Sequence, residues 1–329
     1  MKYRLIDDPV LKAEAEALSL EELLRCVTCP NLVADHDPSI THTLSVFIHP
    51  TTRDKAHDLI TKINSGGSRT LFVTDMECGP GTALKGTTAF PSMRAAMQSH
   101  DPKLAYQMGA CAAVEGRNAG FSWTFGPCVD IAGYHDSPIT SIRSAGETAR
   151  VVLTYAGNYW QGLQDYGMIA TLKHFPGDGY CVNDQHLTTA VNPLDRGEWD
   201  QSFGLIYRHL IDQGAKAIMP GHIALPCYDT PDKTSGLYRP TTLSKRILTD
   251  LLREKLGFEG IIMSDAVNMS GFCGYMNYYQ ACAEFLESGG DCLLFAHPDD
   301  EFITEMKKMI DEGRLNMETL RHRAYRMLL

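Results

Sequence analysis

The sequence lacks long hydrophobic runs. No stretch approaches the roughly 18 consecutive apolar residues that a membrane-spanning helix needs. The N-terminal segment MKYRLIDDPVLKAEAEAL carries too many charges for a signal peptide. These two features predict a soluble, cytoplasmic protein without a membrane partner.

A surplus of positive charge is also lacking. The chain has 30 Lys and Arg against 40 Asp and Glu, which gives a formal net charge of -10 and a pI near 5.6. A sequence-independent nucleic-acid binder needs the opposite balance, because Lys and Arg must displace counterions from the phosphates. We therefore expect no nucleic-acid partner, and a neutral or locally anionic small substrate fits the charge better.

Paired cysteine motifs are almost absent. The ten cysteines are scattered singly, which favours reduced, buried thiols over a disulfide framework. The one CxxC motif is Cys26-Val27-Thr28-Cys29, and a zinc site of this type would need a second pair. We expect ordinary packing for these cysteines, no metal and no cofactor.

A glycine-rich phosphate-binding fingerprint is missing after the first predicted strand, which disfavours a doubly wound nucleotide-binding sheet. The chain instead alternates short apolar runs with amphipathic stretches. Strands are expected at 43–48, 70–74, 121–125, 168–172, 215–219, 260–263 and 292–295. Helices are expected at 51–64, 101–119, 147–166, 199–213, 244–256 and 278–288, with two more in 301–329.

This alternation contains seven strand-then-helix units, and an eighth strand is not visible. A chain of 329 residues that is 44% hydrophobic can bury a large core. The pattern predicts an α/β protein with a parallel sheet, which we interpret as a single (β/α)8 TIM-like barrel with one irregular or missing strand. Residues 1–329 would form one domain, with 1–42 as a helical lead-in.

The densest group of reactive side chains follows the apolar run 168–172. Lys173-His174-Phe175-Pro176-Gly177-Asp178-Gly179 is followed four residues later by Asp184-Gln185-His186. Proline and glycine end the strand and open a loop, in which polar side chains can converge on a ligand.

Polar residues also follow other predicted strands. Any one of them alone is more simply a turn, capping or bracing residue. Five strands nevertheless end in this way, and the carboxyl ends of barrel strands share one face, which is where such enzymes hold their active sites. The residues are Asp75, Asp130, Lys173 with His174, His222, and Asp265.

Four segments resemble glycoside hydrolase family 3, and within it the bacterial β-N-acetylglucosaminidase branch. LGFEGIIMSD (256–265) resembles the strand that carries the nucleophile, and KHFPGDG with the later DQH resembles the loop of that branch. DME (75–77) with FPS (90–92), and SWTFGPCVD (122–130) with RS (143–144), resemble the other two. The resemblance spans about residues 43–329 in the family's order.

The resemblance implies a barrel fold and a retaining, exo-acting β-N-acetylhexosaminidase that acts on small carbohydrates. Asp265 would be the nucleophile that forms a covalent glycosyl-enzyme. The sugar hydroxyls in the first subsite would be held by Asp75, Arg143, Lys173 and His174.

A retaining glycosidase also needs a proton donor for the leaving oxygen, which is usually a second carboxyl group. Here the donor would be His186. The carboxylate of Asp184 can accept a hydrogen bond from one ring nitrogen and stabilise the imidazolium, while the other nitrogen donates to the glycosidic oxygen.

Three alternatives remain open. An N-acetylglucosaminide phosphorylase would share every catalytic residue, because an imidazole that is neutral after proton donation does not repel phosphate. A β-glucosidase or β-xylosidase of the family would usually take its acid from a second domain. A non-catalytic sugar-binding barrel would lack the nucleophile or the pair formed by Asp184 and His186, called the dyad below. This sequence has both.

The sequence departs from the resembled pattern at three places. Ala83 replaces the usual arginine of the peptidoglycan-recycling enzymes, and the paired glycines there read Cys78-Gly79. Gln185 replaces Ser or Thr within the dyad triplet, and Asp178 stands where His or Asn is common. The first departure weakens an assignment to muropeptide recycling, so the natural substrate stays open.

Other residues support weaker hypotheses. His222 could line the pocket and contact substrate, or brace a strand end. Met269 could cover the sugar, although core packing is more usual. Glu77 is more simply a partner for an arginine than a second catalytic carboxylate. A metal site formed by His174, Asp178, Asp184 and His186 is disfavoured, because metal-binding spacings such as HxH are missing.

Overall fold

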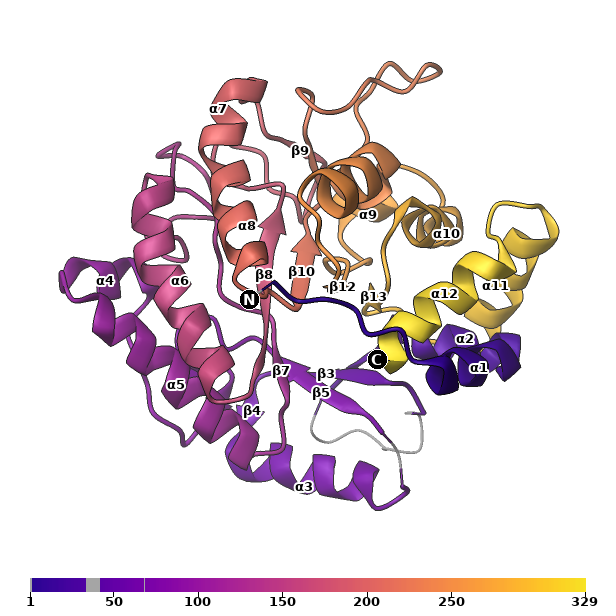
Figure 1. Cartoon of the computed structure of the whole chain (residues 1–329), viewed down its shortest axis with the longest axis horizontal. Helices are drawn as coiled ribbons and strands as arrows, with labels where there is room; N and C mark the ends of the chain where they lie inside the picture. The colour runs from indigo at the N-terminus through magenta and orange to yellow at the C-terminus, as the bar shows by residue number, and fades with distance from the viewer. Residues whose placement is uncertain (1, 34–41, 68) are drawn as a thin grey trace.

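The computed structural model describes residues 2–33, 42–67 and 69–329 of the chain. Its centre is a curled sheet of seven parallel strands with helices around the outside (Figure 1). In sheet order the strands are β12 (Ile261–Ile262), β10 (Ala217–Pro220), β8 (Ile169–Phe175), β7 (Trp123–Thr124), β5 (Leu71–Thr74), β3 (Ser45–Ile48) and β2 (Asn31–Leu32). Neighbours in the sheet follow one another in sequence, whereas a doubly wound sheet reverses its order at a switch point. The predicted parallel α/β class is therefore confirmed.

The two edges of this sheet have further parallel partners. Beyond β12, Met263 bridges Cys292, which leads into β13 (Leu293–Leu294). Strand β13 pairs with β1 (Thr28–Cys29), and only Pro30 separates β1 from β2. Pro30 has no N–H to donate, but its carbonyl accepts the N–H of Phe47 at 2.9 Å.

The expected helical lead-in does contain α1 (Pro9–Ala17) and α2 (Leu20–Cys26), but β1 and β2 follow them. Residues 34–41 of the predicted lead-in lie outside the described residues. The proline within a short apolar run hid these strands, because proline usually argues against a strand.

The seven predicted strands are all found, within two or three residues of their expected ends. The large helices also match, except that the helix expected at 199–213 is broken at Ser202. The larger helical elements are α3 (Arg53–Asn64), α5 (Pro102–Asn118), α6 (Ala149–Asp165), α7 (Arg196–Gln201), α8 (Phe203–Asp212), the π-helical η4 (Arg246–Lys255), α10 (Tyr278–Ser288), α11 (Asp300–Asp311) and α12 (Met317–Leu328).

Short helices and strands lie in the loops between these elements. They are β4 (Thr51–Thr52), β6 (Leu84–Lys85), β9 (Ala190–Val191), β11 (Ile223–Ala224), α4 (Met93–Gln98), α9 (Ser270–Cys273), η2 (Pro80–Thr82) and η3 (Thr241–Leu243). Pairing of β9 with β11 lies directly after the loop that carries Asp184 and His186, and it connects that loop to the segment after β10.

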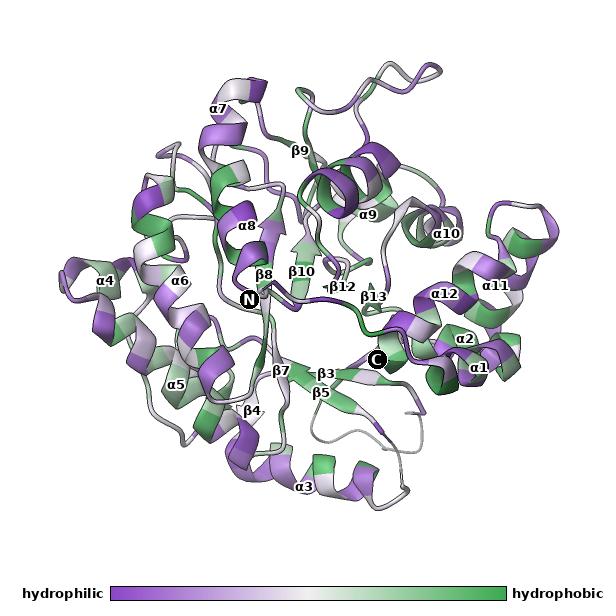
Figure 2. Cartoon of the chain, viewed as in Figure 1, coloured by the Kyte–Doolittle hydropathy of each residue, from purple (hydrophilic) through white to green (hydrophobic). Residues whose placement is uncertain are grey.

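The core has two parts, because successive residues of a strand point to opposite faces of the sheet. One part lies between the sheet and the surrounding helices, whose apolar sides face the strands (Figure 2). The other lies inside the curl, where Phe47 and Phe125 stack with ring centroids 5.7 Å apart beside Trp123 and Met219. Among the described residues, no helix combines the length and the apolar character needed to cross a membrane.

Candidate active site

Charged side chains gather in a cavity of about 260 Å³ at the carboxyl ends of the strands. Its polar lining residues are Asp75, Glu77, Arg143, Lys173, His174, His186, Asp265 and Asn268. Its apolar lining includes Phe47, Phe125, Met219, Met269 and Phe295. Of the five strand ends predicted to meet at one pocket, three supply the predicted side chains: Asp75, Lys173 with His174, and Asp265. Asn268 and Phe295 were missed, although Asn268 follows the strand predicted at 260–263 and Phe295 is the last residue of the strand predicted at 292–295.

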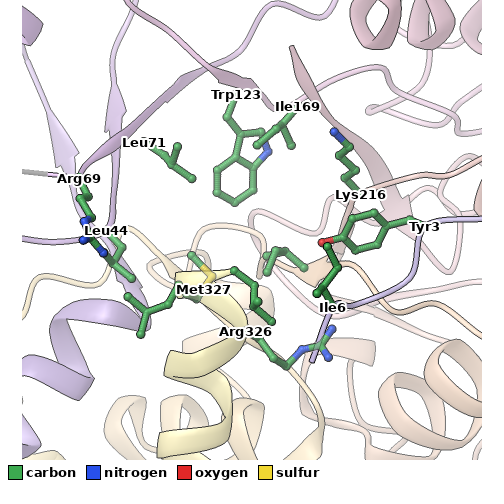
Figure 3. A pocket seen from close by; sticks show the side chains of 13 residues that line it. Tyr3, Ile6, Leu44, Arg69, Leu71, Trp123, Ile169, Lys216, Arg326 and Met327 are labelled. Atoms are coloured by element: carbon green, nitrogen blue, oxygen red, sulfur yellow. The ribbon is translucent and has the colours of Figure 1, made fainter. Parts of the chain in front are cut away.

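A larger cavity of about 440 Å³ lies at the opposite end of the sheet. Leu71, Trp123, Ile169 and Ile261, which begin their strands, line it together with Met327 of α12 (Figure 3). Its lining is mainly apolar. None of the predicted catalytic or sugar-binding residues lines it. Those that line a cavity lie at the carboxyl ends of the strands.

Two cations and two carboxylates form a network on one wall of the smaller cavity. Lys173 Nζ lies 2.8 Å from Asp75 Oδ1 and 2.6 Å from Glu77 Oε1. Arg143 contacts Glu77 through Nε at 3.0 Å and Nη2 at 2.8 Å. Burial by itself would raise the pKa of Glu77, but Lys173 and Arg143 outweigh it and lower that pKa. Glu77 is therefore an ionised partner of the cations, in agreement with the preferred hypothesis, and is unsuited to donating a proton.

His174 is held by the fully buried Asp130. Asp130 Oδ2 lies 2.7 Å from His174 Nδ1, and Asp130 Oδ1 accepts the backbone N–H of His174 at 3.1 Å. The carboxylate fixes the ring so that Nε2 lies 3.4 Å from Arg143 Nη2 and 4.0 Å from Asp265 Oδ2. Asp130 therefore orients His174 from behind, and it does not line the cavity itself.

Asp265 projects into the cavity just beyond β12. Its N–H donates to the carbonyl of Pro220 at 3.2 Å, and its Oδ1 accepts the N–H of Ala266 at 2.8 Å. Burial favours a raised pKa, but His174, His222 and Lys173 together lower the pKa of Asp265. An ionised carboxylate at the cavity wall is the state that a nucleophile requires.

Asp184 and His186 form a hydrogen-bonded pair on the loop after β8. His186 Nδ1 lies 2.6 Å from Asp184 Oδ1, which also accepts the backbone N–H of His186 at 2.9 Å. Burial raises the pKa of Asp184, but the contacts with His186 outweigh this effect and lower it. The ionised carboxylate favours the ring form that carries a proton on Nδ1, so Nε2 is the ring nitrogen that Asp184 does not engage.

His222 occupies a different place from the one predicted. It is fully buried and does not line the cavity. Its Nδ1 lies 3.0 Å from Thr242 Oγ1, and its Nε2 lies 3.1 Å from the carbonyl of Ala266. Because both ring nitrogens are engaged, the bracing hypothesis fits and the substrate-binding assignment does not. The ring supports the residue next to Asp265.

His174, Asp178, Asp184 and His186, which the sequence disfavoured as a metal site, do not form a cluster of ligands among the described residues. Among the described residues, the three side chains within reach of a common ion are Cys128, Asp130 and His174. Hydrogen bonds account for this cluster, since Cys128 Sγ lies 3.1 Å from Asp130 Oδ2. In the CxxC motif, burial raises the pKa of both Cys26 and Cys29 to about 12, which disfavours a metal-binding or redox-active thiolate.

Asp178 is a buried carboxyl group behind the cavity, only 2% exposed. Its N–H donates to Asp130 Oδ1 at 2.8 Å, and its own Oδ1 accepts the N–H of Gly179 at 2.6 Å. Burial, together with the negative charge of Asp130, raises the pKa of Asp178 to about 7.

The raised pKa of Asp178 predicts a pH-dependent stability. The folded protein binds this proton more tightly than the unfolded chain, so the stabilising contribution is present at low pH and is lost as the pH rises through about 7. Asp178→Asn lacks this titrating group. The difference in free energy of unfolding, variant minus wild type, should therefore be about 2 kcal/mol larger at about pH 8 than at about pH 5. Chemical denaturation of both proteins at the two pH values measures this, and a difference that does not change with pH would contradict it.

Known proteins resemble the chain over most of its length. The sequence profile described as "Glycosyl hydrolase family 3 N terminal domain" matches residues 48–329. A Cellulomonas fimi protein named "Beta-N-acetylglucosaminidase/beta-glucosidase" is 32% identical over 291 residues, which are 87% of this chain and 52% of that protein. A "Beta-hexosaminidase" of Pasteurella multocida is 33% identical over 286 residues, which are 83% of this chain and 76% of the relative.

A solved structure described as "Beta-glucoside phosphorylase BglX bound to 2FGlc" superimposes with a TM-score of 0.92 at 27% sequence identity. The match covers 100% of this chain and 62% of the phosphorylase chain. The chain thus spans about half the length of the Cellulomonas fimi relative and less than two thirds of the phosphorylase. The profile match and the two relatives together establish that the chain belongs to glycosyl hydrolase family 3.

Proposed function

We propose that the chain is a retaining, exo-acting glycosidase that removes terminal β-linked N-acetylhexosamine. One observation carries this proposal: Asp265 and His186 line the same cavity as a cluster of side chains suited to sugar hydroxyls. That cluster is Asp75, Arg143, Lys173 and His174. The names of the Cellulomonas fimi and Pasteurella multocida relatives support the same activity.

In the first step, Asp265 attacks the anomeric carbon and forms a glycosyl ester. His186 Nε2 gives its proton to the departing oxygen and becomes neutral, while Asp184 keeps the proton on Nδ1. In the second step, the neutral imidazole takes a proton from water, which attacks the same carbon and releases Asp265. The proton removed in the first step is thereby restored.

The cations have a defined part in this scheme. Lys173 and Arg143 are held by carboxylates, so their N–H groups are oriented before the sugar arrives. Pre-oriented donors and acceptors lose little entropy on binding. The terminal sugar is therefore held with its anomeric carbon at Asp265. The curled sheet would provide the rigid support for this geometry as a TIM-like barrel closed through β12, β13 and β1.

A glycoside phosphorylase is the second candidate, favoured by the solved phosphorylase that superimposes on the whole chain. Phosphate in place of water would attack the glycosyl ester and give a sugar 1-phosphate. The acid/base group is neutral at that stage, so it does not repel the anion. The N-acetyl or glucosyl preference is a separate question, since the Cellulomonas fimi relative carries both activities in its name.

Product analysis tests the proposal. With p-nitrophenyl β-N-acetylglucosaminide and the corresponding glucoside, we expect release of nitrophenol from the N-acetyl substrate alone. The sugar product should be free N-acetylglucosamine whether or not phosphate is present. Formation of sugar 1-phosphate would assign the phosphorylase, and activity on the glucoside alone would assign a glucosidase. Failure to turn over either substrate would favour a non-catalytic sugar-binding protein.

A further inference from the structure

The two residues that depart from the resembled family around the dyad contact each other. Gln185 Nε2 donates to Asp178 Oδ2 at 3.3 Å. Gln185 is 1% exposed and Asp178 is 2% exposed, so this contact is shielded from water. Both residues lie in the loop after β8, seven positions apart in the sequence. The unusual side chains are therefore partners of each other.

The oxygen of the Gln185 amide binds the segment that follows β10. Gln185 Oε1 accepts the backbone N–H of His222, just after β10, at 2.8 Å. One side chain thus ties the dyad loop to the turn after β8 and to the end of β10. Because Gln185 is buried, loss of either bond leaves a polar group without a partner, and that is costly.

Glycines fit closely around this anchor. A Cβ added at Gly221 would lie 2.6 Å from Gln185 Oε1, and one added at Gly271 would lie 2.4 Å from the backbone carbonyl of Gln185. Both distances are far shorter than a van der Waals contact. Any larger residue at either glycine would therefore collide with Gln185. The adjacent carbonyl of His186 also accepts the N–H of Ser270, at 2.9 Å.

The neighbours of Gln185 have much less support from their side chains. Asp184 and His186 have side chains that are 31% and 54% exposed, so packing alone does not hold them. We propose that Gln185, held by Asp178, is a positioning residue that fixes the dyad backbone so that His186 reaches the leaving oxygen. This role rests on the proposed glycosidase function.

A role in positioning the acid has a kinetic signature. Displacement of His186 impairs proton donation, whereas attack by Asp265 is unaffected. Alkyl glycosides need full protonation of their leaving oxygen, and p-nitrophenyl glycosides need little. Loss of the anchor should therefore lower kcat/KM for an alkyl N-acetylglucosaminide much more than for the p-nitrophenyl substrate. A general loss of folded structure would lower both alike.

The hydrogen bond can be broken and then rebuilt in the reverse direction. Gln185→Glu keeps an acceptor for the His222 N–H but sets a carboxylate oxygen against Asp178. Asp178→Asn sets an amide donor against that of Gln185. In the double variant Asp178→Asn/Gln185→Glu, the asparagine amide can donate to the glutamate while both other hydrogen bonds are kept.

At about pH 8, above the pKa of about 7 of Asp178, each single variant should lose ~10- to 100-fold in kcat/KM on the alkyl substrate. The p-nitrophenyl substrate should change by less than about 5-fold. The double variant should recover to within about 5-fold of the wild type on both substrates. Such recovery distinguishes a hydrogen bond from mere sensitivity of the region to substitution.

A matched control is available on α6, where Gln161 Nε2 donates to Asp165 Oδ1 at 2.6 Å on the exposed surface. Gln161→Glu disrupts the same kind of pair and should leave both activities unchanged. Equal losses on both substrates, or a double variant no better than the worse single variant, would overturn the positioning role. An inactive wild type would overturn the proposed function, and the positioning role with it.

Discussion

Asp265→Asn is expected to lower kcat by about 10⁴-fold on N-acetylhexosaminides. Asparagine has the same size and can still accept the N–H of Ala266, but it lacks the negative charge with which Asp265 is proposed to attack the anomeric carbon. The fold should be kept, because asparagine fills the same space and opens no cavity. Steady-state kinetics, together with calorimetric titration of N-acetylglucosamine, separates loss of chemistry from loss of binding.

The control for this variant is Asp311→Asn, at the exposed end of α11, which should leave turnover unchanged. Asp265→Asn should still bind the sugar. Wild-type turnover in Asp265→Asn would refute the nucleophile, whereas loss of both turnover and binding would mean that Asp265 acts in assembling the site.

His186→Ala is expected to show the second large effect, and its size should depend on the leaving group. Removal of the acid should lower kcat/KM by ~10³-fold for an alkyl N-acetylglucosaminide, but by less than about 10-fold for the p-nitrophenyl glycoside in the glycosylation step. The reason is that p-nitrophenolate departs without needing a proton. Measuring both substrates with the same protein preparation gives the ratio directly.

His135 offers a matched control for His186. It forms a similar pair with a neighbouring aspartate, with Nδ1 3.2 Å from Asp136 Oδ1, but its side chain is fully exposed on the surface. His135→Ala should change neither substrate. If His186→Ala slowed the two substrates equally, the proton-donor role would be refuted.

Much of the fold could be predicted because nearly all residues of the predicted strands are buried. Buried parallel strands are continuous apolar runs, and these runs located all seven predicted strands. The strands β1 and β2 were missed because Pro30 lies between them and proline usually argues against a strand. Their pairing depends on β13 and β3, which are distant in sequence, so no local pattern revealed it.

The sequence predicted most of the side chains that lie together in the site. Asp75, Arg143, Lys173, His174, His186 and Asp265 line one cavity. The direction of each side chain was less predictable. His222 follows its strand as the others do, yet its ring lies between Thr242 and Ala266, away from the cavity. The end of a strand determines where the backbone of a residue lies. The direction of its side chain depends on the packing around it.

The sequence by itself determined the parallel α/β class, the order of the strands and the charges at their carboxyl ends, because apolar periodicity and loop composition are local properties. Tertiary structure alone decided that Glu77 is an ionised partner of two cations, that Asp130 lies behind His174, and that Gln185 contacts Asp178. These facts depend on distances between segments that meet only after folding. Burial and the nearest charge, which set the ionisation of each group, exist only in the folded chain.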